Sequence, residues 1–212
     1  MSPGNDLLFF PKVKSILKIR EGETSGALPK EERLFSYFDY KNWELKEGER
    51  WELIYGEAFA MSAPGARHQE ILGGLFNQFY TFLRGKPCKV YPAPYDVRLF
   101  YEEDESDDTV VQPDIVVICD QKKRGHEGCR GAPDLVVEIL SPSNTAIEME
   151  RKFRLYKKSG VREYWVVDPE NKGLKIYNFS TPVTATTYSD DDTVPVAIFP
   201  DLNVSLEKAF AE

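Results

Sequence analysis

Histidine and cysteine are both scarce in this chain of 212 residues, which contains two histidines and three cysteines. The cysteines are widely spaced and show neither a disulfide framework nor a zinc-binding pattern. We therefore expect a protein that works in a reducing cytoplasm. The small number of histidines also leaves few ways to assemble a Ser/His/Asp or Cys/His catalytic centre.

Long apolar runs and an excess of positive charge are absent as well. Because no run of about 18 apolar residues occurs, we expect no membrane span, and residues 1–10 do not have the pattern of a secretory signal. The formal net charge is -8, which argues against a general polyanion binder. Much of this acidity lies in two runs, 102–108 and 190–192, typical of solvated loops, so a nuclease is not excluded.

The remaining composition suits one folded domain. Hydrophobic residues make up 42% of the chain, which is enough for a core. Residues 1–33 contain scattered prolines and glycines without sustained periodicity and are predicted to form an irregular arm. Residues 34–212 are predicted to form a single domain.

The apolar pattern alternates between helical and strand spacing. A short helix is predicted over about 30–42, and a longer one over 64–84. Tyr55-Gly56 predicts the turn of a hairpin. Strands are predicted over 88–91, 95–101, 110–119, 133–141, 163–168 and 174–179, with a helix between the fourth and fifth that ends at about 159. Because that helix forms a strand–helix–strand crossover, the fold class is α/β, with a mixed central sheet flanked by helices, an N-terminal hairpin and a C-terminal β tail.

Two carboxylates occupy positions that a purely structural sequence would fill differently. Asp114 begins the apolar run 115–118, and Glu138 lies inside the apolar strand 135–140. A buried carboxylate is normally protonated, paired or bound to a metal. If the two strands are neighbours, both side chains reach one point and suit Mg²⁺. The structural alternatives are a buried salt bridge or a strand-end carboxylate exposed at the sheet rim. Asp134 is an alternative ligand, which we expect at the opposite strand end.

The helix that follows Glu138 carries an unusual lysine. Placed at 100° intervals, Met149, Phe153 and Tyr156 form the inward stripe, and Lys152 shares their face. A lysine in a buried stripe needs an acidic partner unless its stem extends to the rim.

These residues carry a family resemblance. The segments 112–117, 131–143 and 160–169, together with 51–57, His68-Gln69 and 96–98, resemble the Uma-two-type family of restriction-endonuclease-like proteins over roughly residues 34–210. The resemblance implies the PD-(D/E)xK nuclease fold, a restriction-endonuclease-like core in which an Asp and a Glu hold Mg²⁺.

The motif positions follow from the resemblance residue by residue. It implies that Pro113-Asp114 supplies the first motif and that Glu138 supplies the acidic residue of the second. Nucleases of this superfamily usually have a lysine two residues after the Glu, but Leu140 occupies that position here. The resemblance implies that Lys152, on the following helix, takes the role of that lysine. Asp114 and Glu138 are therefore the expected metal ligands, with Lys152 as the expected catalytic cation.

Two further residues are candidates for the site. His68 lies at the start of the long helix, where the helix N-terminus favours neutral imidazole, so it could act as a base or orient a water. A capping or core-edge histidine is the alternative. In the hairpin, Glu52 and Glu57 project from one face. We choose Glu57 because it is nearer the turn, while a solvated hairpin face remains the plain alternative.

Other polar residues are assigned structural or surface roles. Asp96 and Arg98 are interpreted as a pair at a strand edge. His126 lies in the basic segment 122–130, which is interpreted as a surface loop that could contact phosphates.

The leading hypothesis is a Mg²⁺-dependent nuclease that hydrolyses phosphodiester bonds, with Mn²⁺ as an alternative metal. The rival is a non-catalytic binding module that retained the fold, which the acidic net charge favours. DNA is favoured over RNA as the partner, no membrane partner is expected, and a homodimer is kept as an option. The sequence leaves sequence specificity and biological role open.

Overall fold

The computed structural model describes residues 34–211, and the predicted arm at 1–33 lies outside the described residues. The larger of its two main sheets is mixed and has six strands, in the order β11-β10-β9-β8-β6-β3. Only β8 and β9 pair in parallel within it. Its strands are β3 (Lys89–Pro92), β6 (Ile115–Ile118), β8 (Leu135–Ile139), β9 (Glu163–Asp168), β10 (Gly173–Asn178) and β11 (Thr184–Ser189).

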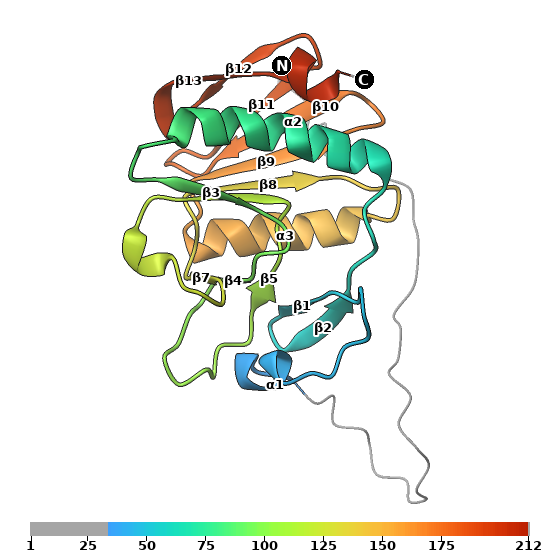
Figure 1. The fold of residues 1–212 in the computed structure, drawn as a ribbon, viewed down its shortest axis with the longest axis vertical. Helices are drawn as coiled ribbons and strands as arrows, with labels where there is room; N and C mark the ends of the chain where they lie inside the picture. Colours follow the sequence, from blue (N-terminus) through green and yellow to red (C-terminus); the bar gives the residue numbers. More distant parts are fainter. Residues whose placement is uncertain (1–33, 212) are drawn as a thin grey trace, which may run out of the picture.

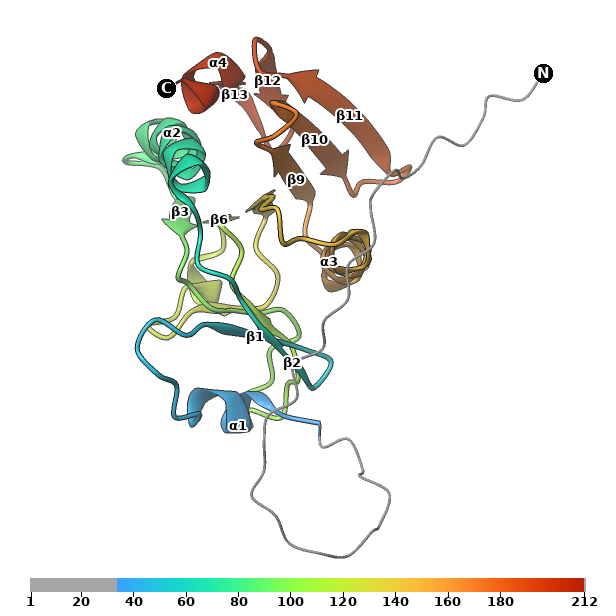
Figure 2. The same ribbon diagram turned by 90° about the vertical axis from the view of Figure 1, so that its right-hand side faces the viewer.

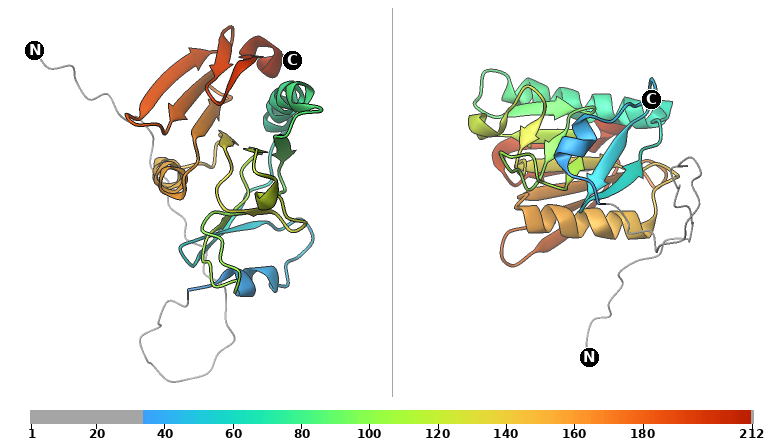
Figure 3. Two further views of the ribbon diagram at one scale, coloured as in Figure 1. Left: turned by 90° about the vertical axis from the view of Figure 1, so that its left-hand side faces the viewer. Right: turned by 90° about the horizontal axis from the view of Figure 1, so that it is seen from below.

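A second sheet of five strands has the order β2-β1-β5-β4-β7. The expected hairpin forms two of its strands, and it turns at Tyr55 and Gly56, which both have positive φ. This sheet and the short helix α1 (Tyr37–Lys41) lie at the end of the molecule opposite the C-terminal elements (Figures 1 and 3). Its strands are β1 (Trp51–Ile54), β2 (Glu57–Ala60), β4 (Val97–Arg98), β5 (Val110–Val111) and β7 (Cys129–Arg130).

Two long helices cover the main sheet from opposite faces (Figure 2). These are α2 (Ala66–Leu83) and α3 (Ala146–Ser159). Because successive residues of a strand point to opposite faces, β6 and β8 contribute to two cores. Ile115, Leu135 and Val137 pack in the core with α2, whereas Val116 and Val136 pack in the core with α3.

Helix α3 has clear start and stop signals. Thr145 is its N-cap and forms a capping box with Glu148, an arrangement that stabilises a helix by about 1 kcal/mol. Gly160 ends it with a φ of 96°, a left-handed conformation that glycine adopts without a steric penalty. The expected crossover between β8 and β9 is confirmed, and it holds α3 over the strand that carries Glu138.

The C-terminal tail forms a small separate ladder. Strands β12 (Thr193–Val196) and β13 (Phe199–Ser205) pair antiparallel, and helix α4 (Leu206–Phe210) packs against α2. A 3₁₀ turn, η1 (Gln121–Lys123), precedes β7. Among the helices of residues 34–211, none has the length and apolar character that crossing a bilayer requires.

The expectation that the cysteines are not disulfide-bonded is wrong for two of the three residues. Cys88 and Cys119 form a disulfide across β3 and β6. They occupy the next facing positions after the pair Lys89 and Ile118, so the strand register brings them together. Cys129 is free and buried. The disulfide removes the premise from which a reducing compartment was inferred.

Candidate functional site

Asp114 and Glu138 face one another at the ends of two neighbouring strands. The antiparallel register of β6 and β8 pairs Ile115 with Val137, so the next facing positions are Asp114 and Glu138. Directly facing residues of an antiparallel pair project on the same side, with Cβ atoms about 5 Å apart. The backbone N–H of Ile139 donates to Oδ2 of Asp114 at 2.7 Å and fixes that carboxylate beside β8. The structure thus brings together the two acids that the sequence singled out.

Helix α3 supplies two donors to Glu138. Nζ of Lys152 lies 2.9 Å from Oε1 of Glu138, and the hydroxyl of Tyr156 donates to the same oxygen. Lys152 and Tyr156 are four residues apart and therefore share a face of the helix. Lys152 lies against the predicted acid. Tyr156 was assigned only to the apolar stripe, although a buried tyrosine hydroxyl usually requires a partner.

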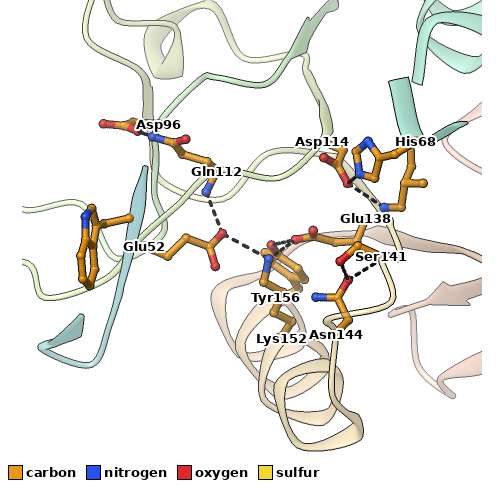
Figure 4. A network of polar contacts seen from close by, with 12 residues as sticks. Glu52, His68, Asp96, Gln112, Asp114, Glu138, Ser141, Asn144, Lys152 and Tyr156 are labelled. Carbon is orange, nitrogen blue, oxygen red and sulfur yellow. Dashed lines mark hydrogen bonds and ion pairs between the residues drawn. The ribbon is translucent and has the colours of Figure 1, made fainter. Parts of the chain in front are cut away.

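Glu52 joins the network from the other sheet (Figure 4). Its Oε1 accepts from Nζ of Lys152 at 3.2 Å and from the backbone N–H of Gln112 at 3.0 Å. The prediction that Glu57 rather than Glu52 lies in the site is therefore wrong, because Glu52 is the glutamate that contacts Lys152. Glu57 is exposed on β2, the edge strand, whereas β1 lies between β2 and β5 and places Glu52 in the interior.

His68 contacts Asp114 from the first turn of α2. Its Nε2 lies 3.2 Å from Oδ2 of Asp114, and its Nδ1 is buried without a hydrogen-bond partner. Burial lowers the pKa of this imidazole, but the hydrogen bond and charge of Asp114 outweigh burial, so the pKa is raised. Asp114 thus opposes the bias towards neutral imidazole that was expected from the helix N-terminus.

The electrostatics of the site are dominated by an excess of carboxylates. Burial and the negative charges of Glu52 and Asp114 raise the pKa of Glu138 to about 7, although Lys152 opposes them. Burial lowers the pKa of Lys152, but Glu138 and Glu52 together raise it above its ordinary value. Lys152 is therefore held as a cation between two acids.

A second group of polar side chains surrounds Gln112, whose backbone N–H donates to Glu52. The side-chain amide of Gln112 donates to Oδ1 of Asp96 at 2.7 Å, and Tyr40 also contacts both residues. Burial raises the pKa of Asp96. The expected pair of Asp96 and Arg98 is wrong, because Asp96 bonds to Gln112 and Tyr40 whereas Arg98 forms a buried ion pair with Asp107.

Two other candidates lie away from the network. Asp134 accepts from the backbone N–H of Cys119 at 2.8 Å and pairs with Arg162, at the end of β8 opposite Glu138, as expected. His126 is exposed in the loop before β7, as the surface-loop interpretation predicts.

The donor set suits a hard divalent cation with water ligands. Glu52 and Glu138 share the ammonium of Lys152, and Asp114 adds the charge of a third carboxyl group near Glu138, so another positive charge would offset the excess. Mg²⁺ prefers carboxylate oxygens and keeps several waters, so two protein ligands suffice. Across residues 34–211, no group of three or more His, Cys, Asp or Glu side chains is placed to hold a metal. An ion that needs a complete protein cage would not fit.

Individual proteins are similar to this chain in sequence or in structure. An uncharacterized protein of Synechocystis, slr1290, is 28% identical over 141 residues, covering 66% of this chain and 72% of its own. A crystal structure described as a putative nuclease belonging to DUF820, from Anabaena variabilis, superposes with a TM-score of 0.66 at 20% identity. That match covers 84% of this chain and 98% of the other, and shows that the two share a fold.

The family match spans most of the described chain. The family described as "Uma2: Putative restriction endonuclease" matches residues 38–207. That range begins in α1, ends in α4 and contains every residue of the network around Glu138. The chain therefore belongs to the Uma2 family of restriction-endonuclease-like proteins.

Proposed function

We propose that the protein is a metal-dependent nuclease that hydrolyses phosphodiester bonds. The observation that carries the proposal is the facing pair Asp114 and Glu138, with Lys152 at 2.9 Å from Glu138. Burying acids together with a lysine is costly to stability, and perturbed ionisable groups of this kind cluster at functional sites. The family's description supports phosphodiester chemistry and favours DNA over RNA as the substrate.

Each side chain has a distinct role in this proposal. Asp114 and Glu138 would hold a Mg²⁺ or Mn²⁺ ion, which when bound supplies an activated water and positive charge near the scissile phosphate. Lys152, kept charged by its two acids, neutralises negative charge that develops on the phosphate.

The surrounding residues act as positioning groups. Glu52 and Tyr156 fix Lys152 and Glu138 by hydrogen bonds, and His68 orients the carboxylate of Asp114. A site held in this way loses little entropy when substrate binds.

The test is cleavage of single-stranded DNA, duplex DNA and RNA by purified protein with Mg²⁺, Mn²⁺, Ca²⁺ or a chelator. Asp114→Asn and Glu138→Gln should abolish cleavage. Asp134→Asn is the matched control, because position 134 lies at the end of β8 opposite Glu138. The Asn side chain still offers an oxygen that accepts from the backbone N–H of Cys119. Absence of cleavage by the parent under every condition would favour the non-catalytic module, and cleavage that survives in both variants would indicate a contaminant.

A further inference from the structure

Two cations of α3 rest on aromatic rings of the other sheet. The guanidinium carbon of Arg151 lies 4.3 Å from the ring centroid of Phe59. Nζ of Lys158 lies 4.9 Å from the ring centroid of Tyr55 and 5.4 Å from that of Phe100. The two cations are seven residues apart, or two helical turns, so they share one face of α3.

This face flanks the candidate site. Lys152 follows Arg151 directly, and Phe59 faces Glu52 across the hairpin. The contact of Arg151 with Phe59 therefore lies next to the contact of Lys152 with Glu52. Figures 2 and 3 show α3 running beside the hairpin, so this face lies next to the elements that carry Lys152 and Glu52.

In the part of the chain that the structure describes, neither of these two cations pairs with an acid. Lys152 and Arg154, on the same helix, pair with carboxylates. Within residues 34–211 neither Arg151 nor Lys158 forms a salt bridge, although acids outnumber bases by 35 to 27 in the whole chain. A cation on an aromatic face keeps its full charge while its side chain is held in place. Such a cation is ready to bind a phosphate.

Tyr55 gives an independent reason to assign a ligand to this surface. It is 40% exposed and has a φ of 51° at the first turn position, followed by Gly56 at 79°. Asn or Gly fits that position of a hairpin turn at lower cost than a bulky aromatic residue. The turn thus tolerates backbone strain to present an aromatic ring, a pattern that is common where a residue has a function.

We propose that Arg151, Lys158, Tyr55 and Phe59 form a binding surface for a single nucleic-acid strand beside Glu138 and Lys152. Arg151 and Lys158 contact the phosphates, and a base stacks on the exposed part of the Tyr55 ring, which itself stacks on Phe100 with 6.2 Å between ring centroids. A single strand is favoured over a duplex because stacking requires an unpaired base. This inference rests on the proposed function, because it takes nucleic acid as the ligand of the site.

The closing experiment measures binding without catalysis. Fluorescence anisotropy of a labelled single-stranded DNA oligonucleotide, in EDTA and over a range of salt, compares the parent with Lys158→Gln, Arg151→Gln and Lys157→Gln. Lys157 is the matched control: it is the exposed neighbour of Lys158 and lies 100° around the helix. Lys158→Gln and Arg151→Gln should each lower the salt slope by about 0.7. Lys157→Gln should leave the slope unchanged, and an equal effect of all three would overturn the proposal.

Tyr55→Asn tests the stacking role with a variant that suits the turn. It should lose little thermal stability, because the readiness of Asn to adopt positive φ offsets the lost contacts with Phe100 and Lys158. Binding should weaken roughly fivefold or more, which is the usual effect of removing one stacking ring. Unchanged binding, tighter binding to duplex, or no binding by the parent at low salt would each overturn the surface. Cleavage is assayed separately with Mg²⁺, so binding without cleavage would contradict the catalytic proposal while leaving this one intact.

Discussion

Nζ of Lys152 lies 2.9 Å from Oε1 of Glu138, although Lys152 belongs to a helix and Glu138 to the strand before it. The same nitrogen lies 3.2 Å from Oε1 of Glu52, which belongs to the other sheet. One ammonium therefore connects three elements, and the loss of its charge would leave two buried acids without a counter-ion.

Lys152→Met should abolish cleavage and also destabilise the fold. Met matches the volume of the lysine stem, but removing one partner from a buried ion pair costs about 3 to 5 kcal/mol. Chemical denaturation at about pH 8, where Glu138 is ionised, should show this loss.

A double variant separates charge from packing. Glu138→Gln added to Lys152→Met should recover most of the lost stability, because it removes one of the two unpaired acids. Purely additive losses in the two single variants would show that the ion pair does not govern the stability of this region.

The stability of the metal-free protein should fall as the pH rises from about 4.5 to about 7. The pKa of Glu138 is about 7 in the folded protein against an ordinary 4.5, chiefly because of burial. In this window the folded protein keeps a proton that the unfolded chain has lost, so raising the pH favours unfolding. The full effect is about 3 kcal/mol.

Denaturation of parent and Glu138→Gln in EDTA measures this dependence. The groups that face Glu138 are Lys152 and Tyr156 from α3, Glu52 from β1, and Asp114. All of them remain in the variant, so the difference in unfolding free energy between the two proteins isolates Glu138. A difference that stays constant across the window would contradict the buried, proton-binding role of this carboxyl group.

Asp114→Asn should lower the pKa of His68. Asp114 raises that pKa by a hydrogen bond and by its charge, whereas burial lowers it. Asn keeps an acceptor for the N–H of Ile139, so the strand ends should stay in place. With only two histidines in the chain, NMR titration of the imidazole resonances resolves His68 from His126, which serves as the internal control. An unchanged His68 titration would show that the contact does not form in solution.

Much of the central fold could be predicted because its signals are local. The crossover helix is marked by the cap at Thr145 and the stop at Gly160. The hairpin register follows from a two-residue turn. The five-stranded sheet was not predicted as a unit, because β4 and β5 have two residues each and show no period. Their pairing depends on contacts that are distant in the sequence.

The sequence identifies those site residues that lie in or beside apolar runs, because such runs indicate burial. Asp114 and Glu138 stand out because each adjoins an apolar run. Glu52 and Glu57 share a face, so choosing between them required knowing that β1 pairs with β5. The protonation of His68 depends on a residue 46 positions away, which no local pattern contains.

Replacing one cysteine of the Cys88–Cys119 pair should cost stability only under oxidising conditions. The bond closes a loop with a sequence separation of 31, and cross-links of this length contribute about 2 to 4 kcal/mol by restricting the unfolded chain. Cys119→Ser should therefore unfold at lower denaturant than the parent without reductant, and at nearly the same concentration with it. Cys129→Ser is the control, because this thiol is free; its effect should not depend on reductant. If reductant leaves the parent's unfolding midpoint unchanged, the two cysteines are unpaired thiols in solution, and the strand register alone keeps them together.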